Sequence, residues 1–445
     1  MRRIFVPALH VPARKTTFNP FMKTLSILSI FFASIGSSLA ADGGTLSLNE
    51  ALALATSRSP ELAAFSYDER AADARLLQAG LKPNPVITFE HENFSGSGDF
   101  NWAEQSETTL SLGRLLELGG KREARMEVAR AGQAAVRFEY QAKRREVLGR
   151  TAVAFVEVLG AQRRVELAEE TAKLAAEFVP LIQQRAAAGV ASTLETARGD
   201  VALATAQVGV EQARRELSAA RRALATQWGA KSATFSEVTG NIDRQPSLPT
   251  FASAFAKLSR HPLITRWDAE KEVRMAIVER ERANAKPDIT VTGGARWLQG
   301  DGEAALVAGV SIPWPYTNRN QGNIAEAQAL AQKTEAEKRT AQAALTGQLG
   351  EAWESLAKAM NQIEVLESKL LPAANSAIEA ASTAYQAGRL SQLEILDARR
   401  TLTDARTQAL QARIAAHKAA ASIDALTAPA RDFTDKTVQP PARKR

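Results

Sequence analysis

The sequence predicts a mainly α-helical protein made of two tandem halves, each with the order helix, short strand, short strand, very long helix and helix. Three observations support this fold class: a long heptad pattern, an internal repeat at an offset near 200 residues, and short alternating segments that come in pairs. The chain has 445 residues, of which 45% are hydrophobic, and no Cys. Disulfides, thiolate metal sites and a lipid-modified N-terminal Cys are therefore excluded.

Residues 1–40 are typical of an export signal peptide. Met22 and Lys23 precede an apolar run, which ends before a sequence that resembles a cleavage site, Ser38-Leu39-Ala40. Residues 1–21 fit no signal pattern, so Met22 is the expected start. The leader carries five Lys and Arg, and without them the net charge of +7 falls to +2, so the charge does not indicate nucleic-acid binding. Past this leader no run of about 18 apolar residues occurs, and no transmembrane helix is expected.

The internal repeat defines the expected domains. The first repeat covers residues 45–240 and the second residues 250–428, with a Pro-containing linker between them. A polar tail, residues 429–445, is expected to be disordered. The matching segments are Arg58–Leu62 with Arg260–Ile264, Lys82-Pro83 with Lys286-Pro287, Ser111 with Ser311, and Gly189 with Gly388.

The long helices give the clearest signal. Apolar residues recur from Leu345 to Ala387 at alternating steps of four and three, which predicts coiled-coil packing with a left-handed supercoil. The second part of this seam consists of Ala373, Ala377, Ala380, Ala384 and Ala387. Pro372 lies inside the run, where a Pro costs about 3 kcal/mol, so a kink or break is expected there. The segment 121–188 would be about 100 Å long as one helix, a length suited to crossing the periplasm.

Four short segments alternate between apolar and polar residues, as strands with one apolar face do. They begin at Val86, Thr108, Ile289 and Leu306. This pattern fits a lipid-facing, water-lined barrel strand, and it fits a half-buried sheet of a soluble protein equally well. Trp102, Trp297 and Trp314 near the strand ends fit an interfacial aromatic belt or a soluble core. Four strands cannot enclose a water-filled lumen, so membrane strands would require several chains in one barrel.

Two motifs make the resemblance to a known family specific: AGLKPNPVITFEHENFSGSG (Ala79 to Gly98) and LELGGKR (Leu116 to Arg122). With the tandem halves and the signal peptide, they resemble the TolC family of outer-membrane efflux proteins, and in particular the CzcC-type outer components of cobalt–zinc–cadmium resistance systems. The resemblance covers about residues 45–428. It implies a homotrimer with a 12-stranded barrel in outer-membrane lipid and a periplasmic α-helical tunnel.

The resemblance also implies partners, a periplasmic adaptor protein and an inner-membrane pump of the resistance-nodulation-division class. It implies no cofactor. Many members of the family carry a lipidated N-terminal Cys, which this sequence lacks.

Two expected hairpin tips are the candidate functional sites. Gly189 and Gly388 each follow a long helix, as a C-terminal capping Gly does, and an acid follows each of them at the same distance, Glu195 and Glu394. An acid in the first turn of a helix is an ordinary way to favour the helix dipole. The resemblance instead implies that the tips line a periplasmic entrance. There Tyr385 and Arg389 would hold the entrance shut against Glu195, and Glu394 and Asp397 would form an acidic ring. In the family pattern the Arg falls one residue later, where this chain has Leu390.

Neither a metal site nor an enzyme is expected. His91, His261 and His417 are scattered, and His91-Glu92 alone is too small a ligand set for zinc. No nucleophile elbow, P-loop or H-E-x-x-H motif occurs. Three functions remain. The first is a heavy-metal efflux duct, the second is a drug or solvent duct of the same architecture, and the third is a soluble periplasmic coiled-coil scaffold.

Overall fold

The computed structural model describes residues 44–100 and 102–427. The expected signal peptide (residues 1–40) and polar tail (residues 429–445) lie outside these residues. In each half the predicted order of helix, strand, strand, long helix and helix is confirmed. The first half contains α2 (Pro60–Ala79), β2 (Val86–Glu92), β3 (Glu107–Leu116), α3 (Lys121–Ala187) and α4 (Thr193–Thr226). The second half contains α6 (Pro262–Asn284), β5 (Ile289–Leu298), β6 (Glu303–Ser311), α7 (Gln321–Val365), η3 (Leu366–Leu370), α8 (Leu371–Gln386) and α9 (Gln392–Thr427).

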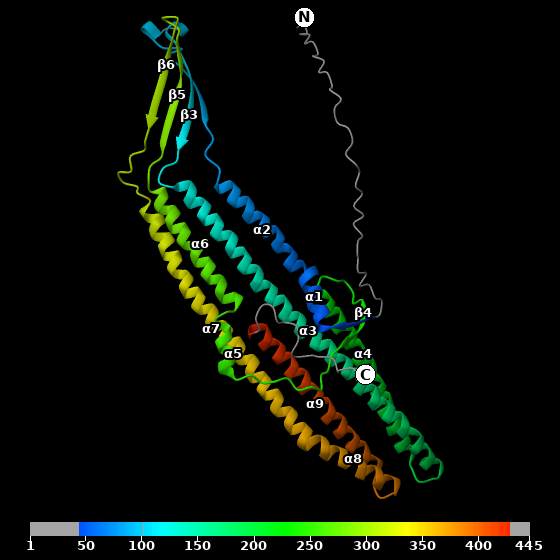
Figure 1. Ribbon diagram of the computed structural model, residues 1–445. Helices are drawn as coiled ribbons and strands as arrows, with labels where there is room; N and C mark the ends of the chain where they lie inside the picture. The colour runs from blue at the N-terminus through cyan, green and yellow to red at the C-terminus, as the bar shows by residue number, and fades with distance from the viewer. Residues whose placement is uncertain (1–43, 101, 428–445) are drawn as a thin grey trace, which may run out of the picture. The chain divides into compact units, whose positions relative to one another are not determined.

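Helices of the two halves pack against each other along their length. The 67 residues of α3 correspond to about 100 Å at 1.5 Å per residue. This helix contacts α2 and α4 of its own half and α6 and α9 of the other, while α7 contacts α6 and α9. Figure 1 shows the strands at one end of these helices, and the turns that join α3 to α4 and α8 to α9 at the other end.

The heptad seam is confirmed as far as Leu370. Up to that residue its members are buried or half-buried against α9. The predicted continuation through Ala373, Ala377 and Ala380 is wrong, because these residues are exposed. The side chains that pack against the neighbouring helices instead belong to the next positions along the chain: Ala374, Ile378, Ala381 and Tyr385.

The cause of this shift is a π turn. Residues Leu366–Leu370 form a π-helix directly before Pro372, which takes one of the first positions of α8. Pro has no backbone N–H and its ring clashes with the carbonyl four residues earlier, so a regular α-turn is unfavourable there. A π turn adds about one residue per turn, which moves the buried stripe by one position. The chain therefore stays helical through Pro372, where the sequence predicted a kink or a break.

A small second sheet was not predicted. Strand β1 (Gly44–Ser47) pairs in parallel with β4 (Phe235–Thr239), and the short helices α1 (Leu48–Arg58) and α5 (Phe251–Leu258) lie outside the predicted order. Gln162 of α3 fixes this sheet, since its side chain accepts from the backbone N–H of Val238 at 2.8 Å and donates to the carbonyl at 3.3 Å. Buried side chains from both strands join the core cluster formed by α3, α4 and α9.

The bend from β3 into α3 uses the two glycines that the sequence singled out. Gly119 and Gly120 both have φ of +75°, a conformation that L side chains rarely adopt. A Cβ atom at Gly119 would also lie only 2.5 Å from the side chain of Lys286, so this position requires Gly for space as well. The bend joins the four-stranded sheet to the helices, and the short helices η1 (Gly98–Phe100) and η2 (Trp102–Gln105) lie in the β2–β3 loop.

Candidate functional site: a two-faced sheet and two hairpin tips

The four-stranded sheet has one apolar face that no other part of the described chain covers. Its strands are antiparallel in the order β2-β3-β5-β6. Most large apolar side chains on this face are exposed by more than half, including Leu306 at 91%, Ile87 at 74% and Phe89 at 67%. A soluble half-buried sheet would cover these side chains with another layer, whereas a lipid-facing sheet leaves them outside.

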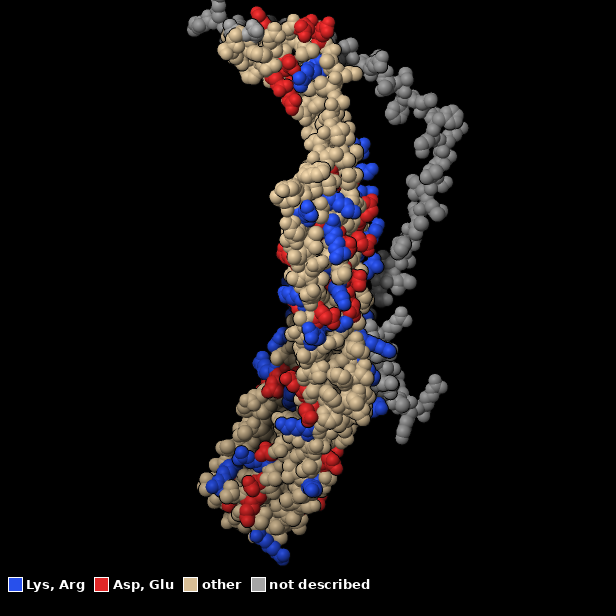
Figure 2. Space-filling model, turned by 90° about the vertical axis from the view of Figure 1, so that its left-hand side faces the viewer, with Lys and Arg blue, Asp and Glu red and all other residues tan. Residues whose placement is uncertain are grey.

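The opposite face of the sheet is polar and acidic. Arg296 of β5 donates to Thr109 at 2.9 Å, to Glu107 at 2.5 Å and to Glu92 at 3.4 Å. Glu90 lies on the same face as Glu92, two residues earlier on β2. Carboxylates therefore outnumber the guanidinium on this face. On the side drawn in Figure 2, the strands form a band almost free of charged side chains, with acidic residues gathered at the loops beyond it.

The two outer strands of the sheet have unpaired edges. Within the described residues β2 pairs only with β3, and β6 pairs only with β5. In lipid no water is present to satisfy the free N–H and C=O groups of such an edge. The sheet is thus complete in a membrane only if strands of another chain pair with both edges.

Exposed aromatic residues lie near both ends of the strands, as the sequence predicted. Trp102 in the β2–β3 loop is 80% exposed, and Trp314, just past the end of β6, is 85% exposed. Trp297 lies one residue before the end of β5 and is half exposed. Exposure of this kind fits an interfacial belt better than a soluble core, which would bury the rings.

The hairpin tips are built by local capping. Gly189 and Gly388 have φ of +72° and +71°, and each closes a turn in which the next residue's N–H returns to a carbonyl of the preceding helix. The two bonds are Val190 N to Arg185 O and Arg389 N to Ala384 O, both 2.9 Å. Ser192 is the N-cap of α4, and the Ser391 hydroxyl, just before α9, accepts from the Glu394 N–H at 3.4 Å.

The acids after the tips first serve these caps. The Glu195 carboxylate accepts from the Ser192 N–H at 3.4 Å, and Glu394 accepts from the Ser391 N–H at 2.9 Å. Bonds from the Ser391 hydroxyl and N–H lower the pKa of Glu394, so this carboxylate is charged at neutral pH. Glu394 and Asp397 are both exposed and lie three residues apart on α9.

The two tips are joined within one chain by a set of contacts that we call the tip cluster (Phe178, Arg185, Tyr385, Gln392 and Arg399). Gln392 is buried and its amide donates to the Glu195 carbonyl at 2.6 Å. The Arg185 guanidinium donates to the Tyr385 carbonyl at 3.1 Å and lies 4.6 Å from the centre of its ring. Arg399 lies in the same way over Phe178, at 4.4 Å, and donates to the Leu174 carbonyl at 2.8 Å.

Tyr385 is almost fully buried in this cluster. Burial raises the pKa of its hydroxyl, with the Arg185 charge acting against that rise and Glu195 adding to it. The hydroxyl itself has no hydrogen-bond partner among the described residues. Arg389, which the family resemblance placed beside Tyr385, is exposed. Within one chain, the guanidinium that contacts Tyr385 is that of Arg185.

The structure brings no metal-binding group together. In the part of the chain that it describes, no three or more His, Asp or Glu side chains are grouped so as to hold a metal ion. His91 contacts Thr108 at 2.9 Å, and His417 is buried against the Ile242 carbonyl at 3.1 Å. His261 caps the start of α6, where its Nδ1 accepts from the Leu263 N–H at 3.2 Å.

The buried ring of His261 should make the stability of the fold sensitive to acid. Burial, helped by the charge of Arg145, lowers its pKa from 6.5 to about 4. The folded state therefore favours the neutral ring, and unfolding takes up a proton between these two values. The neutral His261 contributes its full share to the free energy of unfolding above pH 6.5, and this share is lost as the pH falls towards 4. The total loss is about 3 kcal/mol, at 1.36 kcal/mol for each pKa unit.

Urea unfolding at pH 7.5 and pH 5 measures this effect. Between these two pH values, we expect the free energy of unfolding of His261→Gln to fall by about 2 kcal/mol less than that of wild type, because Gln carries no titrating group. His91→Gln, at an exposed position, serves as the control and should lose as much as wild type. An equal loss in wild type and His261→Gln would contradict the assignment.

An uncovered apolar sheet, joined through the glycine bend between β3 and α3 to paired helices that end in two hairpin tips, is the architecture expected of an outer-membrane export channel component. Among the described residues, none of the helices combines the length and apolar character that a bilayer span requires. Residues 51–230 and 256–428 match the family model "Outer membrane efflux protein", and the chain belongs to this family.

Known relatives and structures agree with this assignment. The chain is 32% identical over 381 residues to the cobalt-zinc-cadmium resistance protein CzcC of Cupriavidus metallidurans, covering 86% of this chain and 90% of that protein. It is 28% identical over 299 residues to the nickel-cobalt-cadmium resistance protein NccC of Alcaligenes xylosoxydans xylosoxydans, covering 67% of each. The solved structure of CusC, a transmembrane channel, aligns with a TM-score of 0.71 at 20% identity, covering 85% of this chain and 91% of that one.

Proposed function

We propose that this protein is the outer-membrane duct of a tripartite efflux system that exports divalent heavy-metal cations. What supports the cargo most is the 32% identity over 86% of the chain to a cobalt-zinc-cadmium resistance protein. The acid surplus on the polar face of the sheet is consistent with it, because carboxylates at a water-lined wall attract cations and repel anions. A duct for drugs or solvents is the second candidate, and the uncovered apolar face argues against the soluble scaffold.

A homotrimer is the assembly that we propose. Three copies would join the unpaired edges of β2 and β6 into a barrel of twelve strands, and the helices would form a tunnel below it. A periplasmic adaptor and an inner-membrane pump of the resistance-nodulation-division class would complete the system and supply the energy. Light scattering of detergent-purified protein should give a protein mass near three chains, and a folded monomer would contradict the shared barrel.

The tips are the proposed periplasmic gate. Glu394 and Asp397 would form an acidic ring at the entrance, and Glu195, Tyr385 and Arg389 would hold it closed. Arg389 is exposed in the single chain, so it could help to close the gate only by contacting another copy. The tip cluster supports the same role, since it holds the two hairpins together.

Deletion of the gene followed by sensitivity tests separates the two cargo classes. With the pump and adaptor intact, we expect the deletion to sensitise cells to one or more of zinc, cobalt, cadmium, nickel and copper, and to leave resistance to hydrophobic drugs unchanged. The reverse pattern would favour the drug duct. Unchanged sensitivity to every compound, in a strain with no second duct, would overturn the proposal.

A further inference from the structure

A groove with a volume of about 1030 Å³ lies where α3 passes the end of α4 and the junction of α6 with α9. Arg145 of α3 lines it and is only 7% exposed. Its Nη2 atom is fully buried and has no hydrogen-bond partner among the described residues. An arginine keeps its proton at physiological pH even where burial lowers its pKa, so a full positive charge is buried at this position.

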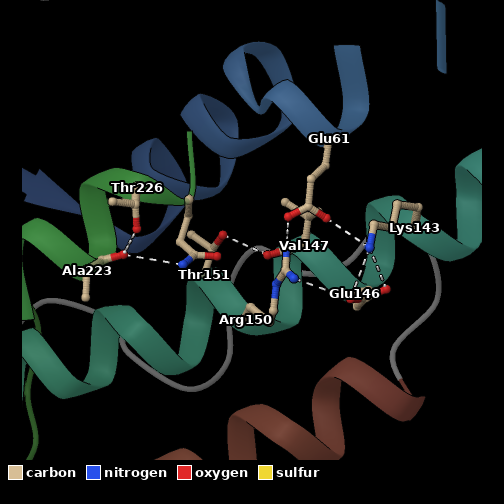
Figure 3. A network of polar contacts seen from close by, with 9 residues as sticks. Glu61, Lys143, Glu146, Val147, Arg150, Thr151, Ala223 and Thr226 are labelled. Carbon is tan, nitrogen blue, oxygen red and sulfur yellow. Dashed lines mark hydrogen bonds and ion pairs between the residues drawn. The ribbon is translucent and has the colours of Figure 1, made fainter. Parts of the chain in front are cut away.

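Glu146, the next residue along α3, is already paired with cations, and so is Glu61 of α2. Figure 3 shows Glu61 bridged by Lys143 at 2.9 Å and by Arg150 at 2.6 Å, with Glu146 held by the same two cations at 3.2 and 3.4 Å. These contacts leave the four residues with no net charge. Further along the groove Glu157 pairs with Lys418 at 2.8 Å and with Arg164 at 2.8 Å.

Nothing else among the described residues neutralises Arg145. No carboxylate oxygen within that part of the chain lies inside the 4.0 Å ion-pair distance, and this holds also for Glu351 of α7, which lines the groove without an ion pair. The charge of Arg145 helps to lower the pKa of the neighbouring His261, whose neutral ring accepts from the Leu263 N–H through Nδ1. A buried charge without a partner is strongly destabilising, so a counter-ion is required.

We infer that Arg145 binds an oxyanion, a carboxylate, phosphate or sulfate group that enters the groove from solvent. The planar guanidinium matches the paired oxygens of such a group. Neutral hydrogen-bonding side chains line the same groove and would bind the rest of the ligand: Gln227, Gln348, Ser355 and Ser422. The positive charge of Arg145 repels divalent cations, so this site differs from the path of the proposed cargo. The inference therefore does not depend on the proposed function.

The site lies at a joint between the two repeats. Arg145 belongs to the first repeat, and His261 and Ala425 belong to the helix ends of the second. Packing there is tight, since a Cβ at Gly149 would lie 2.8 Å from Ala425. Oxyanion binding should therefore raise the stability of the folded protein, by the mass-action effect of any ligand that binds only the folded state.

The test compares anions at equal ionic strength on detergent-purified full-length protein. Sulfate is excluded from protein surfaces and stabilises folded proteins in general, so only the difference between variants is informative. On changing chloride for 50 mM sulfate or phosphate, we expect the midpoint of thermal unfolding to rise several degrees more in wild type than in Arg145→Met. Arg400→Met, at a position whose side chain is 82% exposed, should behave as wild type does.

Equilibrium dialysis with radiolabelled sulfate provides the direct measurement. We expect one anion per chain in wild type at millimolar concentration, at least tenfold weaker binding in Arg145→Lys, and none in Arg145→Met. Arg145→Lys keeps the charge and tests the site if Arg145→Met does not fold. No bound sulfate in wild type would overturn the inference and point to a carboxylate of another copy as the counter-charge, and equal binding in the variants would overturn it as well.

Discussion

Replacement of Ala308 by Arg should prevent stable insertion of this protein in the outer membrane. Ala308 lies near the middle of β6, on the apolar face, opposite Gly293 of β5. An Arg at the midplane of a lipid-facing strand costs about 2–4 kcal/mol in each chain. In an assembly of three chains this cost occurs three times, which exceeds half of the stability of a typical folded domain.

The neighbouring residue supplies a matched control. Val307 lies on the polar face, opposite Gly294, one position earlier on the same strand. Val307→Arg adds the same charge to the same strand, but the charge would face water, so insertion should be close to that of wild type. Outer-membrane fractionation and the unfolding midpoint in detergent measure both variants. If Ala308→Arg inserts as well as Val307→Arg does, the apolar face is not in contact with lipid.

The strands and long helices could be predicted because each depends on a local pattern. Alternation along β2 and β5 marks the two faces of the sheet, and the repeat confirms each strand by a second copy. Neither the alternation nor the repeat shows which strand pairs with which, however. The parallel pair of β1 and β4 joins segments that are nearly the whole first repeat apart, and their five or fewer residues are too short for a periodic signal.

The seam shows how a local rule fails at a single turn. A heptad assignment assumes a constant number of residues per turn, and the π turn before Pro372 breaks that assumption by about one residue. Every apolar position after it is then displaced, so Ala377 is exposed and Ile378 packs in its place. The Pro was a visible signal for a disturbance, but the sequence does not show whether a helix breaks or widens there.

The tip residues were predicted only in part for a similar reason. Gly189, Gly388 and their capping acids follow from spacing within each hairpin. Arg185 and Gln392 act across two hairpins, and no spacing rule connects them. Arg185 lies four residues before Gly189 and Tyr385 three residues before Gly388, so both lie about one helical turn from their tips. The sequence does not show that the two tips adjoin, and their contact could therefore not be predicted.

Replacement of Arg185 by Met should raise the resting conductance of the duct at least several-fold in planar bilayers. The prediction depends on the proposed gate. The variant removes a charged hydrogen bond of about 1.5–3 kcal/mol and a cation–π contact of about 0.5–2 kcal/mol, while Met retains much of the apolar stem. Both contacts join the α3–α4 hairpin to the α8–α9 hairpin, so their loss frees one tip from the other in every chain.

Gln392→Leu should act in the same direction and less strongly, since it removes one buried bond to the Glu195 carbonyl. Arg198→Met is the control, because Arg198 is exposed near the same tip and should leave conductance unchanged. Tyr385→Phe is a second control. Its buried hydroxyl has no hydrogen-bond partner among the described residues, so removing that hydroxyl alone should leave conductance close to that of wild type. If Arg185→Met folds and conducts as wild type does, the tip cluster stabilises the hairpins without closing the gate, and closure must depend on contacts between copies.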